Sequence, residues 1–112
     1  MRALITSTSR LRSDQYPIYL VAKLLGDAAN QGYNIKELHA CGGKAIAVAA
    51  KSYTTEPFPR PSFHHHPANQ EESILPTMEI LLAVWDGKSK GTEDLISQAK
   101  SLNLPVIITT PH

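Results

Sequence analysis

The run of residues from Ile80 to Thr92 constrains the fold more than any other part of this sequence. Its first half, Ile80 to Trp85, is entirely apolar, and a short apolar run without polar alternation is typical of a strand buried on both faces of a parallel sheet. Its second half combines glycines, lysines and hydroxyl side chains, and a helical pattern follows. A strand, a glycine-rich basic turn and a helix together direct backbone N–H groups toward an anion. We therefore predict that this turn forms one wall of a phosphate or nucleotide site, although the full P-loop pattern is absent.

Strand-like and helix-like segments alternate along the chain. Besides Ile80–Trp85, apolar runs predict strands at Ala3–Thr6, Ile35–Ala40 and Val106–Thr109. Apolar residues at helical spacing predict helices between these strands. Such alternation is typical of βαβ units with a parallel sheet. We therefore predict an α/β fold, a single Rossmann-like three-layer domain over residues 1–112 with a parallel four- or five-stranded sheet. Ala3–Thr6 and Ile80–Trp85 are expected to be adjacent in it.

The predicted helices have recognisable starts and apolar faces. The first has Pro17 in its first turn, with Ser13 or Asp14 near its N-cap. The second begins at Lys44 and is rich in alanine, and the last follows Thr92. The expected apolar faces are Ile18, Val21, Leu24, Leu25 and Ala28 in the first helix, Ile46, Ala49, Ala50 and Tyr53 in the second, and Leu95, Ile96, Ala99 and Leu102 in the last.

The segment Pro57–Pro67 interrupts this alternation. Its prolines exclude a helix and restrict any strand to the edge of the sheet. We expect either a short edge strand around Ser62–His64 or a lid loop, followed by a short helix within Ala68–Leu75. Of the consecutive histidines, only His64 and His66 share a face in an extended chain. Because no His-Glu-x-x-His or comparable spacing includes them, we expect no metal site.

Composition and charge narrow the class of protein. A formal net charge of +1 gives no indication of a nucleic-acid or membrane partner. The single cysteine, Cys41, excludes an internal disulfide and fits a reducing compartment, and we expect it to be a buried structural thiol. The sequence contains neither a signal-peptide pattern nor an apolar stretch of membrane-spanning length. We therefore expect a cytoplasmic protein that needs no cofactor.

The loops that follow the strands carry the candidate ligand-binding residues. In parallel α/β sheets, ligands bind beyond the carboxyl ends of the strands, where the strand order reverses. Basic residues gather in the loops at this edge, namely Arg10, Arg12, Lys44, Lys88 and Lys90. A nearly neutral chain with its cations at one edge indicates an anionic ligand. The residues expected to bind it are Thr6, Ser7, Ser9, Arg10, Gly42, Gly43, Lys44, Asp86, Gly87, Lys88, Ser89, Lys90, Gly91 and Thr92.

Two stretches of the sequence resemble a known superfamily. Arg2-Ala3-Leu4-Ile5-Thr6, followed by Ser9-Arg10, is similar to the opening of the SLOG superfamily of small Rossmann-like nucleotide-binding domains. Leu82–Thr92, with the helix and the Pro-Val-Ile-Ile strand after it, is similar to the closing half of that superfamily. Gly42-Gly43 stands where the family has a Gly-Gly turn. The match is best with short bacterial and phage branches that resemble DprA-like proteins.

The resemblance implies a Rossmann-like fold that binds nucleotides or nucleotide-derived signals. It does not imply catalysis. The phosphoribohydrolase branch has a glutamate three residues after the threonine of its Gly-Thr pair, and that position is Leu95 here.

Three hypotheses for function follow. The first is a module that binds, and so senses or sequesters, a nucleotide, an ADP-ribose-like molecule or a cyclic nucleotide without turning it over. The second is a small hydrolase that cleaves a glycosidic or phosphoester bond of a nucleotide, with His64, His66, Glu71 and Glu72 as candidate acid–base groups. The third is a structural homo-oligomer without a ligand. We expect a homodimer or higher oligomer, because the alanine-rich helix after Lys44 offers a flat surface for subunit packing.

Overall fold

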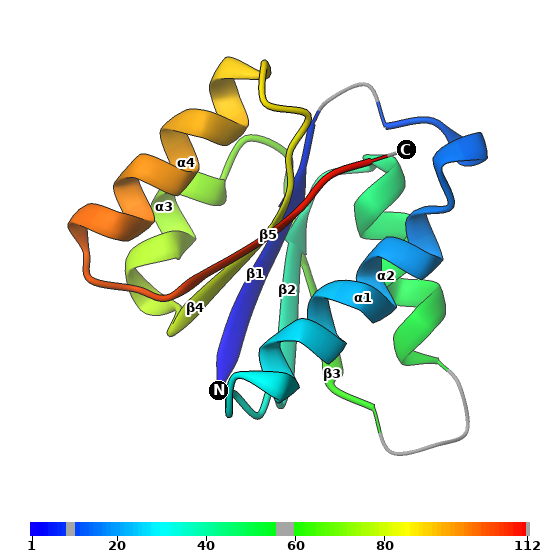
Figure 1. Ribbon diagram of the computed structural model, residues 1–112, viewed down its shortest axis with the longest axis horizontal. Helices are drawn as coiled ribbons and strands as arrows, with labels where there is room; N and C mark the ends of the chain where they lie inside the picture. The colour runs from blue at the N-terminus through cyan, green and yellow to red at the C-terminus, as the bar shows by residue number, and fades with distance from the viewer. Residues whose placement is uncertain (9–10, 56–59, 112) are drawn as a thin grey trace.

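The apolar run at Ile80 forms an inner strand of a parallel sheet (Figure 1). The computed structural model describes residues 1–8, 11–55 and 60–111. Within them one sheet contains β1 (Arg2–Ser7), β2 (Glu37–Cys41), β3 (Ser62–His66), β4 (Ile80–Val84) and β5 (Val106–Thr109). Every neighbouring pair of strands is parallel, which confirms the predicted Rossmann-like α/β fold.

The strand order is β3-β2-β1-β4-β5, so it reverses between β1 and β4. The chain places β2 and β3 on one side of β1 and then crosses back to place β4 and β5 on the other side. β1 and β4 pair along their length, with Ala3 opposite Ile80 and Ser7 opposite Val84. The predicted adjacency of these two strands is therefore confirmed. The crevice beyond their carboxyl ends is where a ligand is expected in this kind of sheet.

Helices cover both faces of the sheet (Figure 1). α1 (Pro17–Asn30) and α2 (Ala45–Thr54) lie on one face, whereas α3 (Glu71–Ile74) and α4 (Lys90–Ser101) lie on the other. Successive strand residues point to opposite faces. Accordingly, Ile5 and Leu82 pack in the core under α1 and α2, whereas Leu4 and Leu81 pack with residues of α4. Burial on both faces explains why the inner strands show no polar alternation.

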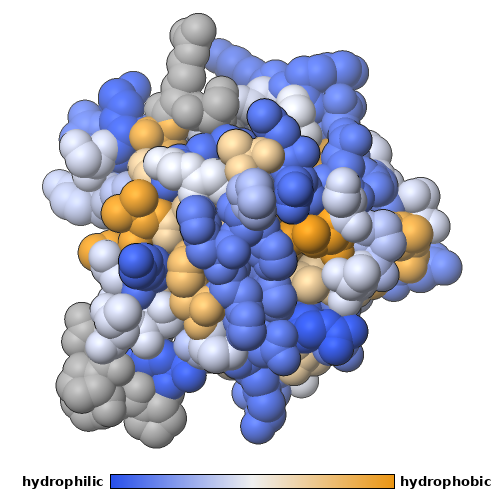
Figure 2. All heavy atoms as spheres, turned by 180° about the vertical axis from the view of Figure 1, so that it is seen from behind, coloured by the Kyte–Doolittle hydropathy of each residue, from blue (hydrophilic) through white to orange (hydrophobic). Residues whose placement is uncertain are grey.

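The edge strand β3 leaves part of one sheet face without a covering helix. Among the described residues β3 pairs only with β2, so the edge-strand prediction for Ser62–His64 is confirmed and extends to His66. The core between the sheet and α4 is built on β1 and β4. The same face of β2 and β3 carries polar side chains, among them Glu37, His39 and His64. Seen from the side of β3, the middle of the molecular surface is hydrophilic (Figure 2).

Two predictions about the helices were wrong in detail. Residues 13–15 form a separate 3-10 turn, so α1 starts after Tyr16 rather than at a Ser13 or Asp14 cap. Ile18 is then 53% exposed instead of lying in the core. Leu102 is likewise exposed, because α4 ends at Ser101.

The alanines of α2 do not form an outer packing surface. Ala47, Ala49 and Ala50 are buried within the core of the chain itself, where α2 packs on α1 and on the sheet. The reason given for subunit packing at this helix is therefore not supported, although the homo-oligomer itself stays a prediction.

Candidate functional site

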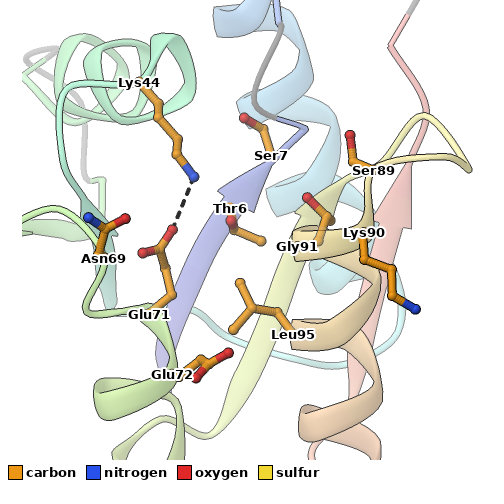
Figure 3. A pocket seen from close by; sticks show the side chains of 11 residues that line it. Thr6, Ser7, Lys44, Asn69, Glu71, Glu72, Ser89, Lys90, Gly91 and Leu95 are labelled. Carbon is orange, nitrogen blue, oxygen red and sulfur yellow. Dashed lines mark hydrogen bonds and ion pairs between the residues drawn. The ribbon is translucent and has the colours of Figure 1, made fainter.

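A cleft opens beyond the carboxyl end of β1, between α3 and the start of α4 (Figure 3). It lies where the strand order reverses, which is the predicted place for a ligand. Its volume is about 480 Å³, within the range of small-molecule sites. The residues that line it are Thr6, Ser7, Lys44, Asn69, Glu71, Glu72, Ser89, Lys90, Gly91, Thr92 and Leu95. The structure thus brings together half of the residues predicted to bind the ligand.

The first turn of α4 presents backbone donors to this cleft. α4 begins at Lys90, and the side chain of the N-cap residue Ser89 makes no capping hydrogen bond. The backbone N–H groups of Lys90, Gly91 and Thr92 have no hydrogen-bond partner among the described residues. A helix start of this kind attracts an anion through hydrogen bonds and through the helix dipole. The side chain of Thr6, at the end of β1, lies across from this turn (Figure 3).

Asp86 holds the turn between β4 and α4 together. Its Oδ1 accepts hydrogen bonds from the backbone N–H groups of Lys88 and Ser89, both at 2.8 Å. Its own backbone N–H donates to the hydroxyl of Thr8 at 3.1 Å. The hydrogen bonds from Ser89 and Lys88 lower the pKa of Asp86. These donors are occupied within the turn, so Asp86, Gly87 and Lys88 shape the turn and do not line the cleft.

The wall of the cleft that faces α4 carries two glutamates, which the sequence analysis named only as candidate acid–base groups and did not place at this edge of the sheet. α3 contributes Glu71 and Glu72. The side chain of Glu71 is 12% exposed, and its Oε2 accepts a hydrogen bond from Lys44 Nζ at 3.2 Å. The charge of Lys44 is therefore already paired, and the side chain of Lys90 points away from this pair (Figure 3). The cleft combines a donor-rich end at α4 with a carboxylate-bearing wall, whereas the sequence analysis expected basic side chains to gather at this edge.

Gly42 and Gly43 lie outside the cleft. With Phe63, His65 and residues of α2 they line a separate cavity of about 320 Å³. Gly42 has a φ of 72°, a left-handed conformation that favours glycine and explains its place in the turn after β2. Ser9 and Arg10 lie outside the described residues, so their contact with a ligand stays a prediction.

His64 and His66 do not line the cleft either. The parallel register of β3 and β2 places His64 beside His39, and His66 Nε2 lies 2.8 Å from His39 Nδ1. The two histidines proposed for a hydrolase thus both contact His39 on the sheet face, whereas the glutamates proposed with them line the cleft.

The sequence analysis did not single out His39 or its strand neighbour Glu37. The available signal was their spacing of two residues inside a predicted strand, which places both on one face. Asn69, which also lines the cleft, follows a proline-rich segment whose path no local pattern indicates.

Comparisons of the chain with models of protein families, with curated proteins and with solved structures find no significant match. In the part of the chain that the structure describes, no helix combines the length and the apolar character needed to cross a membrane.

Proposed function

We propose that the protein binds a nucleotide or a nucleotide-derived signal in the cleft at the end of β1, and so senses or sequesters it without catalysis. The observation that carries this proposal is the first turn of α4. Its unpartnered N–H groups, among the described residues, lie beside the point where the strand order reverses. Rossmann-like folds hold phosphates at helix starts of this kind. The cleft volume of about 480 Å³ suits a ligand of mononucleotide size.

The two ends of the cleft suit two parts of a nucleotide. A phosphate at the start of α4 would accept hydrogen bonds from the backbone and from the hydroxyl of Thr6. The carboxylate of Glu72, on the facing wall, is an acceptor for sugar hydroxyls or for an amino group of the base. Lys44 neutralises Glu71 at 3.2 Å, which reduces the repulsion between that carboxylate and a phosphate.

The resemblance to the SLOG superfamily supports the same class of ligand. Its two matching stretches form β1, β4 and the start of α4, and residues of β1 and α4 line the cleft. Leu95 lines the cleft at the position where the phosphoribohydrolase branch has its glutamate. An apolar side chain there favours binding over hydrolysis. We place this function in the cytoplasm, in keeping with the single thiol of Cys41.

A second candidate function is hydrolysis of a nucleotide bond, which the two cleft carboxylates favour. Glu71 is held by Lys44 and Glu72 lies beside it on α3. Carboxyl groups at a bond to be cleaved can act as general acid and general base. On this hypothesis the glutamates, not His64 and His66, would carry the reaction, because only the glutamates line the cleft.

Incubation of the tag-free protein with a nucleotide panel separates these functions. The protein is freed of unbound nucleotide by buffer exchange, denatured, and its released contents are separated by chromatography. Recovery of one intact nucleotide supports binding without catalysis, and recovery of a cleavage product supports the hydrolase. If no nucleotide is retained or converted, both functions are refuted.

A pair of conservative variants then tests the position of the site. Glu72→Gln removes a cleft carboxylate and should change nucleotide affinity or abolish turnover. Asp94→Asn is its matched control, because Asp94 is an exposed acidic residue of α4 that does not line the cleft. Equal behaviour of the two variants would argue against the cleft.

A further inference from the structure

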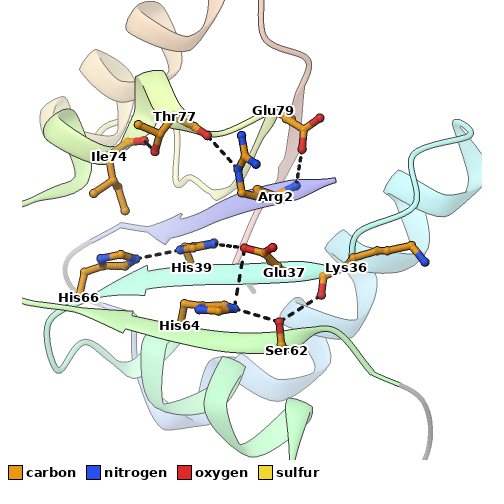
Figure 4. A network of polar contacts seen from close by, with 10 residues as sticks. All are labelled: Arg2, Lys36, Glu37, His39, Ser62, His64, His66, Ile74, Thr77 and Glu79. Atoms are coloured by element: carbon orange, nitrogen blue, oxygen red, sulfur yellow. Dashed lines mark hydrogen bonds and ion pairs between the residues drawn. The ribbon is translucent and has the colours of Figure 1, made fainter.

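A second group of polar side chains lies on the open sheet face of β2 and β3, separate from the cleft lining (Figure 4). Glu37 and His39 are two residues apart on β2, so they point to the same face. The parallel register places His64 of β3 beside His39. We call Glu37, His39 and His64 the His–Glu cluster. No part of the proposed nucleotide site uses it.

The side chains of the His–Glu cluster bring their ligand atoms close together. Glu37 Oε1 lies 3.0 Å from His39 Nε2 and 3.8 Å from His64 Nε2. One ligand atom from each residue lies within 4.8 Å of the other two. The ligand atoms of a tetrahedral zinc ion, at about 2.0–2.2 Å from the metal, are about 3.3–3.6 Å apart. The side chains of Glu37 and His64 are 40% and 44% exposed, which leaves them room to move toward that spacing. The ring of His64, which stacks on His39, has to turn so that its Nε2 faces the ion.

We propose that Glu37, His39 and His64 form a binding site for a divalent transition-metal ion. Two imidazoles and one carboxylate suit zinc or iron(II), whereas magnesium and calcium prefer oxygen ligands alone. Three protein ligands leave at least one coordination position for water or an external ligand. The exposed sides of Glu37 and His64 give the ion a path from solvent.

His66 lies within hydrogen-bond distance of the buried ligand His39, on the side of the ring away from Glu37. His39 is 7% exposed, and its Nδ1 lies 2.8 Å from His66 Nε2. When a metal takes Nε2 of His39, the ring proton resides on Nδ1 and donates to His66. A hydrogen bond of this kind orients a metal-binding imidazole and strengthens it as a ligand.

In the absence of an ion the same groups form a hydrogen-bonded chain. A proton between His39 Nε2 and Glu37 Oε1 occupies the place of the metal, and the rings of His39 and His64 stack at 4.5 Å between centroids. Ser62 Oγ, at 2.9 Å from His64 Nε2, must give way. Metal binding therefore moves the ring proton of His39 from Nε2 to Nδ1, through exchange with solvent, and the ion takes the freed Nε2.

Calorimetric titration of the chelator-treated, tag-free full chain with zinc chloride tests this proposal. We expect one zinc ion per chain. His64→Ala and Glu37→Gln each remove a direct ligand at a partly exposed position, and each should weaken zinc affinity by about 100-fold or more. His66→Ala removes only the supporting hydrogen bond and should weaken it by about 10–100-fold. His65→Ala is the matched control, because its ring bonds to Gly42 O instead of the cluster, and it should bind zinc like the unchanged protein.

Cobalt(II) provides a readout of the coordination itself. A visible absorption band of four-coordinate cobalt should appear in the unchanged protein and in His65→Ala, and should vanish in His64→Ala. Circular dichroism identifies any variant that fails to fold. If His64→Ala does not fold, the isosteric variant Glu37→Gln tests the metal site in its place. The proposal is overturned if zinc does not bind the unchanged protein, or binds a folded His64→Ala or Glu37→Gln variant with equal affinity.

Discussion

Replacing Gly91 with valine should abolish nucleotide binding and leave the fold intact. Gly91 is the second residue of α4 and has no positive φ. Apart from its own turn of helix, a Cβ added there meets no heavy atom of the described residues within 4 Å, so the new side chain points into the cleft, which Gly91 lines. The loss of binding should arise because the side chain obstructs the N–H groups at the start of α4, and not because the turn is strained.

The expected magnitudes follow from this helical position. Glycine in a helix is about 1 kcal/mol less favourable than alanine, and valine lies between them. Valine should therefore raise the free energy of unfolding by about 0.3 kcal/mol, which corresponds to about 1–2 °C in Tm for a domain of this size. If the side chain denies a phosphate two charge-assisted hydrogen bonds of about 1.5–3 kcal/mol each, affinity should fall more than about 100-fold.

Thermal unfolding and calorimetric titration with the tightest nucleotide of the panel measure both effects. Gly26→Val is the matched control, because Gly26 is helical, exposed and equally free of atoms within 4 Å of an added Cβ. It lies on α1 and does not line the cleft, so this variant should keep the affinity of the unchanged protein. Unchanged affinity in Gly91→Val would place the nucleotide site elsewhere. A loss of stability above about 1 kcal/mol would contradict the reasoning about the helix.

Three further predictions concern the thiol, the histidines and assembly. Burial raises the pKa of the Cys41 thiol to about 11. Because the thiolate is the reactive form, iodoacetamide at about pH 8 should modify Cys41 only when urea unfolds the protein. Equal rates of modification with and without urea would contradict this prediction. The pKa of His66 is lower in the folded protein than its unfolded value of 6.5. The stability of the fold is therefore highest above pH 6.5, where His66 is neutral in both states, and it decreases as the pH falls through the pKa of the folded state. In urea unfolding, the free energy of unfolding of His66→Gln should therefore decrease less at low pH than that of the unchanged protein. An identical pH profile of the two proteins would contradict this prediction. Exposed Tyr16, Ile18 and Tyr19 at the start of α1 offer an apolar contact for a homodimer or higher oligomer, which a monomer mass in light scattering would refute.

The sheet and its order of elements were predictable from local patterns. The apolar run at Ile80 reports burial on both faces of a strand, because a strand covered on both sides tolerates few polar residues. The prolines around β3 restricted that strand to the edge, since a proline cannot donate to an inner ladder. The polar turns after β1 and β4 pointed to the cleft, because parallel strands end at the same edge of a sheet.

Local patterns failed where a hydrogen bond or a packing contact competes with them. Ser13 and Asp14 are good capping residues, yet they form a 3-10 turn, and Pro17 starts the helix after Tyr16. The glycine-rich turn was expected to offer its N–H groups to an anion, but Asp86 accepts two of them. Whether a carboxylate folds back onto its own turn depends on the conformation of the turn, which composition alone does not specify.

Which residues form the two candidate sites depends on packing between parts of the chain that are distant in the sequence. Glu71 and Glu72 enter the cleft because α3 lies across from the start of α4. His39 meets His64 because β2 and β3 pair in one parallel register, and a shift by one residue would turn either histidine to the other face. Alternation along a strand shows which residues share a face. The sequence could therefore indicate that Glu37 and His39 lie on one face of β2, and with which residues of β3 His64 shares a face. The contact between the β2 residues and His64 depends on the register of β2 and β3 in the assembled sheet. The spacing of residues along the chain does not determine this register.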